Sequence, residues 1–218
     1  MAKANKETKT VWTTGSLKIA FGLKEILENY PLLDKWIAVE TENVSVAERE
    51  RLEVLRLRLL KNFRSWNEET LKMKFISPIL ELIDYDFEDF QTLFDTEIKG
   101  TVDGIDLKVV TDFTVAKAID DVIQTPYFYF HEYKRKKNNT DDPIAQVLIP
   151  SLIATELNHD NQPIYGCHVI GEMWYFMIFN GREYAIAKGI DATDKKGLER
   201  IFLILKKVRT IIENFSKK

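Results

Sequence analysis

The sequence predicts an α/β fold in which a mixed central β-sheet is flanked by helices, with a helical N-terminal extension. Three observations support this prediction. The chain has 218 residues, enough for one substantial core. From residue 66 onward, segments of helical periodicity alternate with strand-like runs: helix, three strands, helix, three strands, helix. Two dipeptides typical of tight turns, Asp103-Gly104 and Asn180-Gly181, connect neighbouring strands.

Residues 1–65 are expected to form the helical extension, and residues 66–218 the α/β core. Within the extension, apolar residues recur at helical spacing over 17–29 and again over 46–64. The charges of the second helix are interpreted as a solvated face stabilised by pairs four residues apart. These two helices could form a homodimer interface, or they could cap the sheet.

The core elements are predicted from periodicity and turn residues. They are helices over 67–84, 142–158 and 198–215, and strands over 92–102, 105–117, 126–135, 164–170, 173–179 and 183–188. The second of these helices has Asp142 as its expected N-cap and Pro143 at its first position. The aromatic strand over 173–179 is interpreted as a central core strand, although an exposed Trp174 could stack on a base.

Composition excludes several classes of protein. Hydrophobic residues make up 45% and charged residues 30% of the chain, which excludes disordered and collagen-like proteins. The single cysteine, Cys167, excludes an internal disulfide framework and favours the cytoplasm. No signal peptide or membrane-spanning run is expected, so no membrane partner is predicted. A net charge of -3 argues against tight, non-specific nucleic-acid binding over the whole surface.

Three ionisable residues on two successive strands are the strongest candidates for chemistry. Glu132 and Lys134 lie two apart on one strand, so they project to the same face at the end of an apolar run. Asp112 lies inside the preceding apolar strand, where a charge is tolerated only if it is paired or bound to a metal. If the strands are neighbours, Asp112 and Glu132 could hold Mg²⁺ or Mn²⁺ with the Tyr133 carbonyl. Lys134 could then orient an attacking water.

Thr111-Asp112 followed by Glu132-x-Lys134 resembles the signature of the PD-(D/E)XK nuclease superfamily, with Thr111 where proline is common. The resemblance covers the chain from about residue 66. Residues 66–78 look like the acidic helix that opens the core in the N-terminal domain of type I restriction subunits. The resemblance implies catalytic roles for residues of the strands and of both flanking helices: Glu68, Asp112, Glu132, Lys134 and Gln146.

The resemblance implies a restriction-endonuclease-like core and a metal-dependent nuclease that uses Mg²⁺ or Mn²⁺. Such an enzyme would hydrolyse phosphodiester bonds, by analogy in DNA, in restriction, repair or defence against foreign DNA. The run Arg135, Lys136 and Lys137 would then form a positive rim that contacts phosphates without reading sequence. The alternative for this run is a solvated loop.

Other interpretations stay open. Ser65-x-x-Glu68 is a capping-box pattern, which would use Glu68 to start the helix. Gln146 could be a structural amide that binds the backbone. For the whole protein, one alternative is the same fold with a silent site that binds nucleic acid or a partner protein. Another is a structural protein in which Asp112, Glu132 and Lys134 form a buried ion-pair network.

Overall fold

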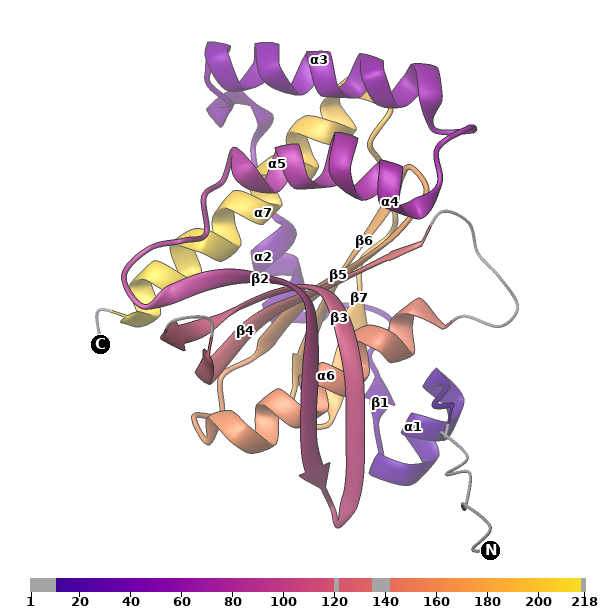
Figure 1. Cartoon of the computed structure of the whole chain (residues 1–218), viewed down its shortest axis with the longest axis vertical. Coiled ribbons are helices and arrows are strands. Elements are labelled where there is room, and N and C mark those ends of the chain that lie inside the picture. Colours follow the sequence, from indigo (N-terminus) through magenta and orange to yellow (C-terminus); the bar gives the residue numbers. More distant parts are fainter. Residues whose placement is uncertain (1–10, 120–121, 135–141, 217–218) are drawn as a thin grey trace, which may run out of the picture.

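A sheet of mixed direction crosses the molecule, with helices on both of its faces (Figure 1). The computed structural model describes residues 11–119, 122–134 and 142–216. The eight strands have the order β1-β7-β6-β5-β4-β3-β2, and β8 pairs with β6. The strands are β1 (Lys24–Glu25), β2 (Phe90–Val102), β3 (Ile105–Ile119), β4 (Val122–Lys134), β5 (Ile164–Ile170), β6 (Met173–Asn180), β7 (Glu183–Ile186) and β8 (Ile190–Asp191). The predicted α/β class with a mixed, helix-flanked sheet is confirmed.

The pairing β4–β5 is parallel, as is β1–β7, and the other pairs are antiparallel. A parallel pair needs a crossover, and α6 supplies it between β4 and β5. The helices are α1 (Thr14–Phe21), α2 (Pro31–Ile37), η1 (Thr41–Asn43), α3 (Val46–Asn62), α4 (Glu68–Leu71), the π-helical turn η2 (Lys72–Ile76), α5 (Ser77–Glu81), α6 (Pro143–Asn158) and α7 (Lys195–Ser216). Among the described residues, no helix is both long and apolar enough to cross a bilayer.

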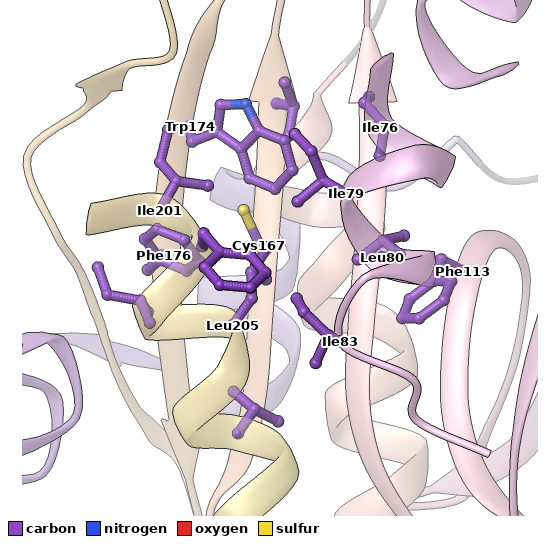
Figure 2. Close-up of a cluster of buried hydrophobic side chains, with 14 of the residues drawn as sticks. Ile76, Ile79, Leu80, Ile83, Phe113, Cys167, Trp174, Phe176, Ile201 and Leu205 are labelled. Atoms are coloured by element: carbon purple, nitrogen blue, oxygen red, sulfur yellow. The ribbon is translucent and has the colours of Figure 1, made fainter. Parts of the chain in front are cut away.

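The two faces of the sheet bury separate hydrophobic clusters. Helices α2, α5 and α7 cover one face, with α3 packed on α7 outside them, and α1 and α6 cover the other. Figure 2 shows Cys167 and Trp174 among the residues of α5 and α7 in the first cluster. Burial raises the pKa of the Cys167 thiol, as expected of an unreactive core residue. Trp174 is fully buried, so the expectation that it could stack on a base is wrong.

Residues 11–65 contribute side chains to both hydrophobic clusters. Strand β1 extends the sheet beside β7, and the indole N–H of Trp36 in α2 donates to the Ile204 carbonyl of α7 at 3.1 Å. The buried face of α3 consists of Leu52, Leu55 and Leu59. The predicted helix over 17–29 is wrong beyond Phe21, because Gly22 adopts a left-handed conformation (φ 64°) and ends α1.

The two predicted turns differ in outcome. Asp103 and Gly104 both have positive φ, 49° and 78°, and they form the expected two-residue turn between β2 and β3. The second turn lies one residue later than predicted, because Asn180 pairs with Glu183 and encloses Gly181 and Arg182. The first turn fixes the register of β3 against β2, and the second fixes the register of β7 against β6.

Candidate active site

Asp112 fills the place where the hydrogen-bond ladder between β3 and β4 ends. The last paired residues are Phe113 and His131, which confirms that the two strands are neighbours. Beyond them, the backbone N–H of Tyr133 donates to Asp112 Oδ2 at 2.7 Å. In an extended strand the N–H and C=O of one residue point to the same side, so the Tyr133 carbonyl also points toward β3. Before Phe113, β3 pairs with β2 alone. There the Asp112 side chain, and not the backbone of β3, accepts the hydrogen bond from β4.

Glu132 and Lys134 form a close ion pair at the end of β4. Lys134 Nζ lies 2.7 Å from Glu132 Oε1, and Glu132 is only 2% exposed. Alternation along the strand puts both on the face of Phe130, while His131 and Tyr133 belong to the opposite face. His131 therefore points away from Glu132.

Glu68 is free of the capping role that its sequence pattern indicates. The N-cap of α4 is Asn67, whose side chain accepts a hydrogen bond from the Thr70 N–H at 2.8 Å. Ser65 instead donates its hydroxyl to the Asn62 carbonyl at 2.9 Å. The capping-box prediction is wrong, because the helix starts two residues later than that box requires. Glu68, as the first residue of α4, directs Oε1 to Lys134 Nζ at 3.5 Å.

Lys72, which the sequence analysis missed, connects Glu68 to Asp112. Its Nζ lies 2.6 Å from Asp112 Oδ1 and 3.8 Å from Glu68 Oε1. Its position four residues after Glu68 was the available signal, since residues at that spacing share a helix face. Carboxylates and ammonium groups thus alternate in what we call the charged cluster: Asp112, Lys72, Glu68, Lys134 and Glu132.

Burial and like charge act together on Glu132. Burial, followed by the charge of Asp112, raises the pKa of Glu132 to about 7, although Lys134 acts in the opposite direction. Burial alone would lower the pKa of Lys134, but its hydrogen bond to Glu132 and the surrounding carboxylates raise it above its usual value. In an isolated ion pair, the pKa of the carboxylate falls and the pKa of the ammonium group rises. Here both pKa values rise, because the cost of burial acts most strongly on the Glu132 carboxylate. Near neutral pH, Glu132 therefore exchanges a proton while Lys134 stays cationic.

The same balance keeps Lys72 charged. Burial lowers the pKa of its ammonium group, but the hydrogen bond and charge of Asp112, together with Glu69, outweigh burial and raise the pKa above its usual value. Glu69 is 74% exposed and lies 3.3 Å from Lys72 Nζ. Lys72 therefore remains a cation whose nearest partner is the carboxylate of Asp112.

Two carboxylates of the charged cluster could hold a hard divalent cation. Among the described residues, no group of three or more His, Cys, Asp or Glu side chains is placed to hold a metal. Mg²⁺ often needs fewer protein ligands than three, because it binds one or two carboxylates and completes its coordination shell with water and substrate phosphate. Asp112 and Glu132 supply two carboxylates, and the pKa of Glu132 is raised first by burial and then by the charge of Asp112, both of which a bound cation would offset. The donor set therefore fits Mg²⁺ or Mn²⁺, on condition that Lys72 releases Asp112.

Gln146 closes the first turn of α6, because its N–H donates to the Asp142 carbonyl at 3.1 Å. Asp142 is the N-cap of this helix as predicted, and its Oδ1 accepts from the Ala145 N–H at 3.1 Å. The Gln146 side-chain oxygen is buried and has no hydrogen-bond partner in the part of the chain that the structure describes. That oxygen therefore makes no hydrogen bond to the charged cluster within those residues, and both predicted roles of Gln146 stay predictions. The predicted rim residues Arg135, Lys136 and Lys137 lie outside the described residues.

His168 extends the row of polar side chains across the sheet and was not anticipated. It is the register partner of Glu132 on the parallel neighbour β5, so both side chains lie on the same face. Its ring stacks on Tyr175 of β6 with 4.7 Å between centroids. Burial lowers the pKa of His168 to about 4, which keeps the imidazole neutral.

No protein-family model matches this sequence, and no curated protein is significantly similar to it. Its function is therefore inferred from the chemistry of the charged cluster.

Proposed function

We propose that the protein is a Mg²⁺- or Mn²⁺-dependent nuclease with a restriction-endonuclease-like core. It would hydrolyse phosphodiester bonds in DNA. Its biological role would be restriction, repair or defence against foreign DNA. One observation carries the proposal: the Glu132 carboxylate is buried beside Asp112 and Lys134, with its pKa raised to about 7. Functional sites are where such perturbed carboxylates concentrate. The single cysteine makes the cytoplasm the expected compartment.

Each residue of the charged cluster has a role in this proposal. A divalent cation bound by Asp112 and Glu132 would polarise the phosphodiester and make a bound water more acidic. Lys134, fixed by its 2.7 Å contact with Glu132, orients the attacking water and stabilises negative charge that develops on the phosphate. Glu68, one-third exposed and 3.5 Å from Lys134, can accept the proton that the water loses.

The test is cleavage of DNA by variants that keep the fold. Glu132→Ala and Lys134→Ala should abolish Mg²⁺- or Mn²⁺-dependent cleavage while thermal melting still shows a cooperative transition. A matched control is Lys108→Ala, which removes an ion pair of similar length, 2.6 Å to Glu97, on the exposed β2–β3 hairpin. Surface pairs contribute little, so this variant should cleave normally. Full activity in the Glu132→Ala or Lys134→Ala variant would reject the assignment.

One observation favours a second candidate function, a silent site on the same fold that binds nucleic acid or a partner protein. Both oxygens of Asp112 are already engaged, Oδ1 by Lys72 at 2.6 Å and Oδ2 by the Tyr133 N–H at 2.7 Å. A protein of this kind would bind DNA without cleaving it and give no heat in a calorimetric titration with Mn²⁺. In a purely structural network, Lys134→Met could be neutral or stabilising.

A further inference from the structure

Lys72 has a place in the charged cluster that the proposed nuclease leaves unexplained. Its side chain is 14% exposed, and its ammonium group is 2.6 Å from the same carboxylate that the divalent cation would need. It belongs to the π-helical turn η2, a local form that occurs often at functional sites. Because the Tyr133 N–H occupies Oδ2 of Asp112, a divalent cation that binds Oδ1 takes the place of the Lys72 ammonium group.

The charge balance of the charged cluster indicates what Lys72 would bind next. Its three carboxylates carry three negative charges when ionised, and its two lysines offset two of them. Glu69 also lies 3.3 Å from Lys72, but its side chain is 74% exposed, so water screens its charge. A divalent cation would turn this net negative charge into a net positive charge of the same size. One phosphodiester group, with a single negative charge, restores neutrality. Buried charges are tolerated only when they are paired in this way.

We propose that Lys72 is a phosphate-binding residue of the site, which Asp112 holds in the cation-free protein and which the divalent cation releases toward the substrate. This inference depends on the proposed function, because it assumes that a cation binds Asp112. It assigns Lys72 two successive partners, the Asp112 carboxylate and then a non-bridging phosphate oxygen. Lys134 differs, because it keeps its partner Glu132 on the same strand face.

The experiment replaces Lys72 by methionine, which keeps the apolar stem and removes the charge. Mn²⁺ affinity is measured by calorimetry at a pH above the pKa of Glu132. Affinity for a short DNA duplex with hydrolysis-resistant phosphorothioate linkages is measured by fluorescence anisotropy in Mn²⁺. The matched control is Lys74→Met, since Lys74 is an exposed lysine of the same turn and lies outside the charged cluster.

Lys72→Met should bind Mn²⁺ about tenfold more tightly, because the ion no longer has to displace a charge-assisted hydrogen bond. The same variant should bind the duplex several-fold more weakly, with a salt dependence reduced by about one phosphate contact. A residue with a merely structural role would not move these two affinities in opposite directions. Unchanged or weaker Mn²⁺ binding, or unchanged duplex binding, overturns the inference while leaving the nuclease proposal in place. If neither the natural protein nor Lys72→Met binds Mn²⁺, the nuclease proposal itself fails.

Discussion

Glu132 lies 2.7 Å from the ammonium group of Lys134, yet its pKa is raised and not lowered. A cation at that distance normally favours the ionised carboxylate. Here the loss of hydration on burial and the charge of Asp112 exceed the attraction of Lys134. The fold therefore holds the ionised Glu132 carboxylate in an unfavourable environment, which a bound cation, as proposed, would make more favourable.

Glu132→Gln should change how stability depends on pH. Between about pH 4.5, its ordinary pKa, and about pH 7, folded Glu132 keeps a proton that the unfolded chain has lost. The unfolded state then binds fewer protons, so this group makes the free energy of unfolding fall as pH rises through that range. The loss amounts to about 3 kcal/mol at most. The difference in the free energy of unfolding between Glu132→Gln and the natural protein should therefore grow in favour of the variant, by up to that amount, from about pH 5 to about pH 8.

Urea unfolding of both proteins at each pH gives this difference. The comparison between variants matters because buried His168, with its pKa lowered to about 4, makes the free energy of unfolding rise with pH over part of the same range. Glu97→Gln, which alters an exposed carboxylate, serves as the control. A Glu132→Gln difference that stays constant with pH would show that Glu132 titrates normally.

The sequence predicts the sheet better than it predicts the helices around the site. The β2–β3 turn at Asp103-Gly104 and the α6 cap at Asp142 depend on local chemistry, and both occur as expected. Asp112 and Glu132 could be placed on neighbouring strands because a two-residue period and short connections leave few alternatives. What the sequence could not indicate was the end of the β3–β4 ladder, which depends on how far two strands stay in contact.

Lys72 and Asn67 show why the rest of the candidate site could not be predicted from the sequence. Two residues near the start of α4, Ser65 and Asn67, can each cap a helix, and only the tertiary fold selects between them. Lys72 shares a helix face with Glu68, but its main partner Asp112 is 40 residues away in sequence. An ion pair of that separation depends on the packing of α4 against the sheet, which periodicity does not reveal.

Asn67→Ala should cost about 1 kcal/mol of stability, because it leaves the Thr70 N–H at the start of α4 without its partner. Ser65→Ala should cost only a few tenths, since it removes an exposed bond to the Asn62 carbonyl. Denaturant unfolding at one pH compares the two variants. A larger loss for Ser65→Ala than for Asn67→Ala would restore the capping box and return Glu68 to helix initiation.

Gly166→Ala should loosen the contact between β5 and α6, the helix that carries Gln146. A Cβ atom at Gly166 would lie 2.5 Å from Val147 Cγ1, closer than unstrained side chains approach. Overpacking of this kind costs about 1–3 kcal/mol. Val147→Ala removes the obstructing methyl group at its own cost of about 1 kcal/mol, so the double variant should lose less than the sum of the two single losses.

A double-mutant cycle measured by denaturant unfolding tests this contact. Gly15→Ala is the control, because the nearest atom to its added Cβ is 3.9 Å away and alanine favours the helical conformation of α1. That variant should be as stable as the natural protein or slightly more stable. Additive losses at Gly166 and Val147 would mean that α6 does not lie against β5 at this point. The packing of α6, the helix of Gln146, on this face of the sheet would then be wrong.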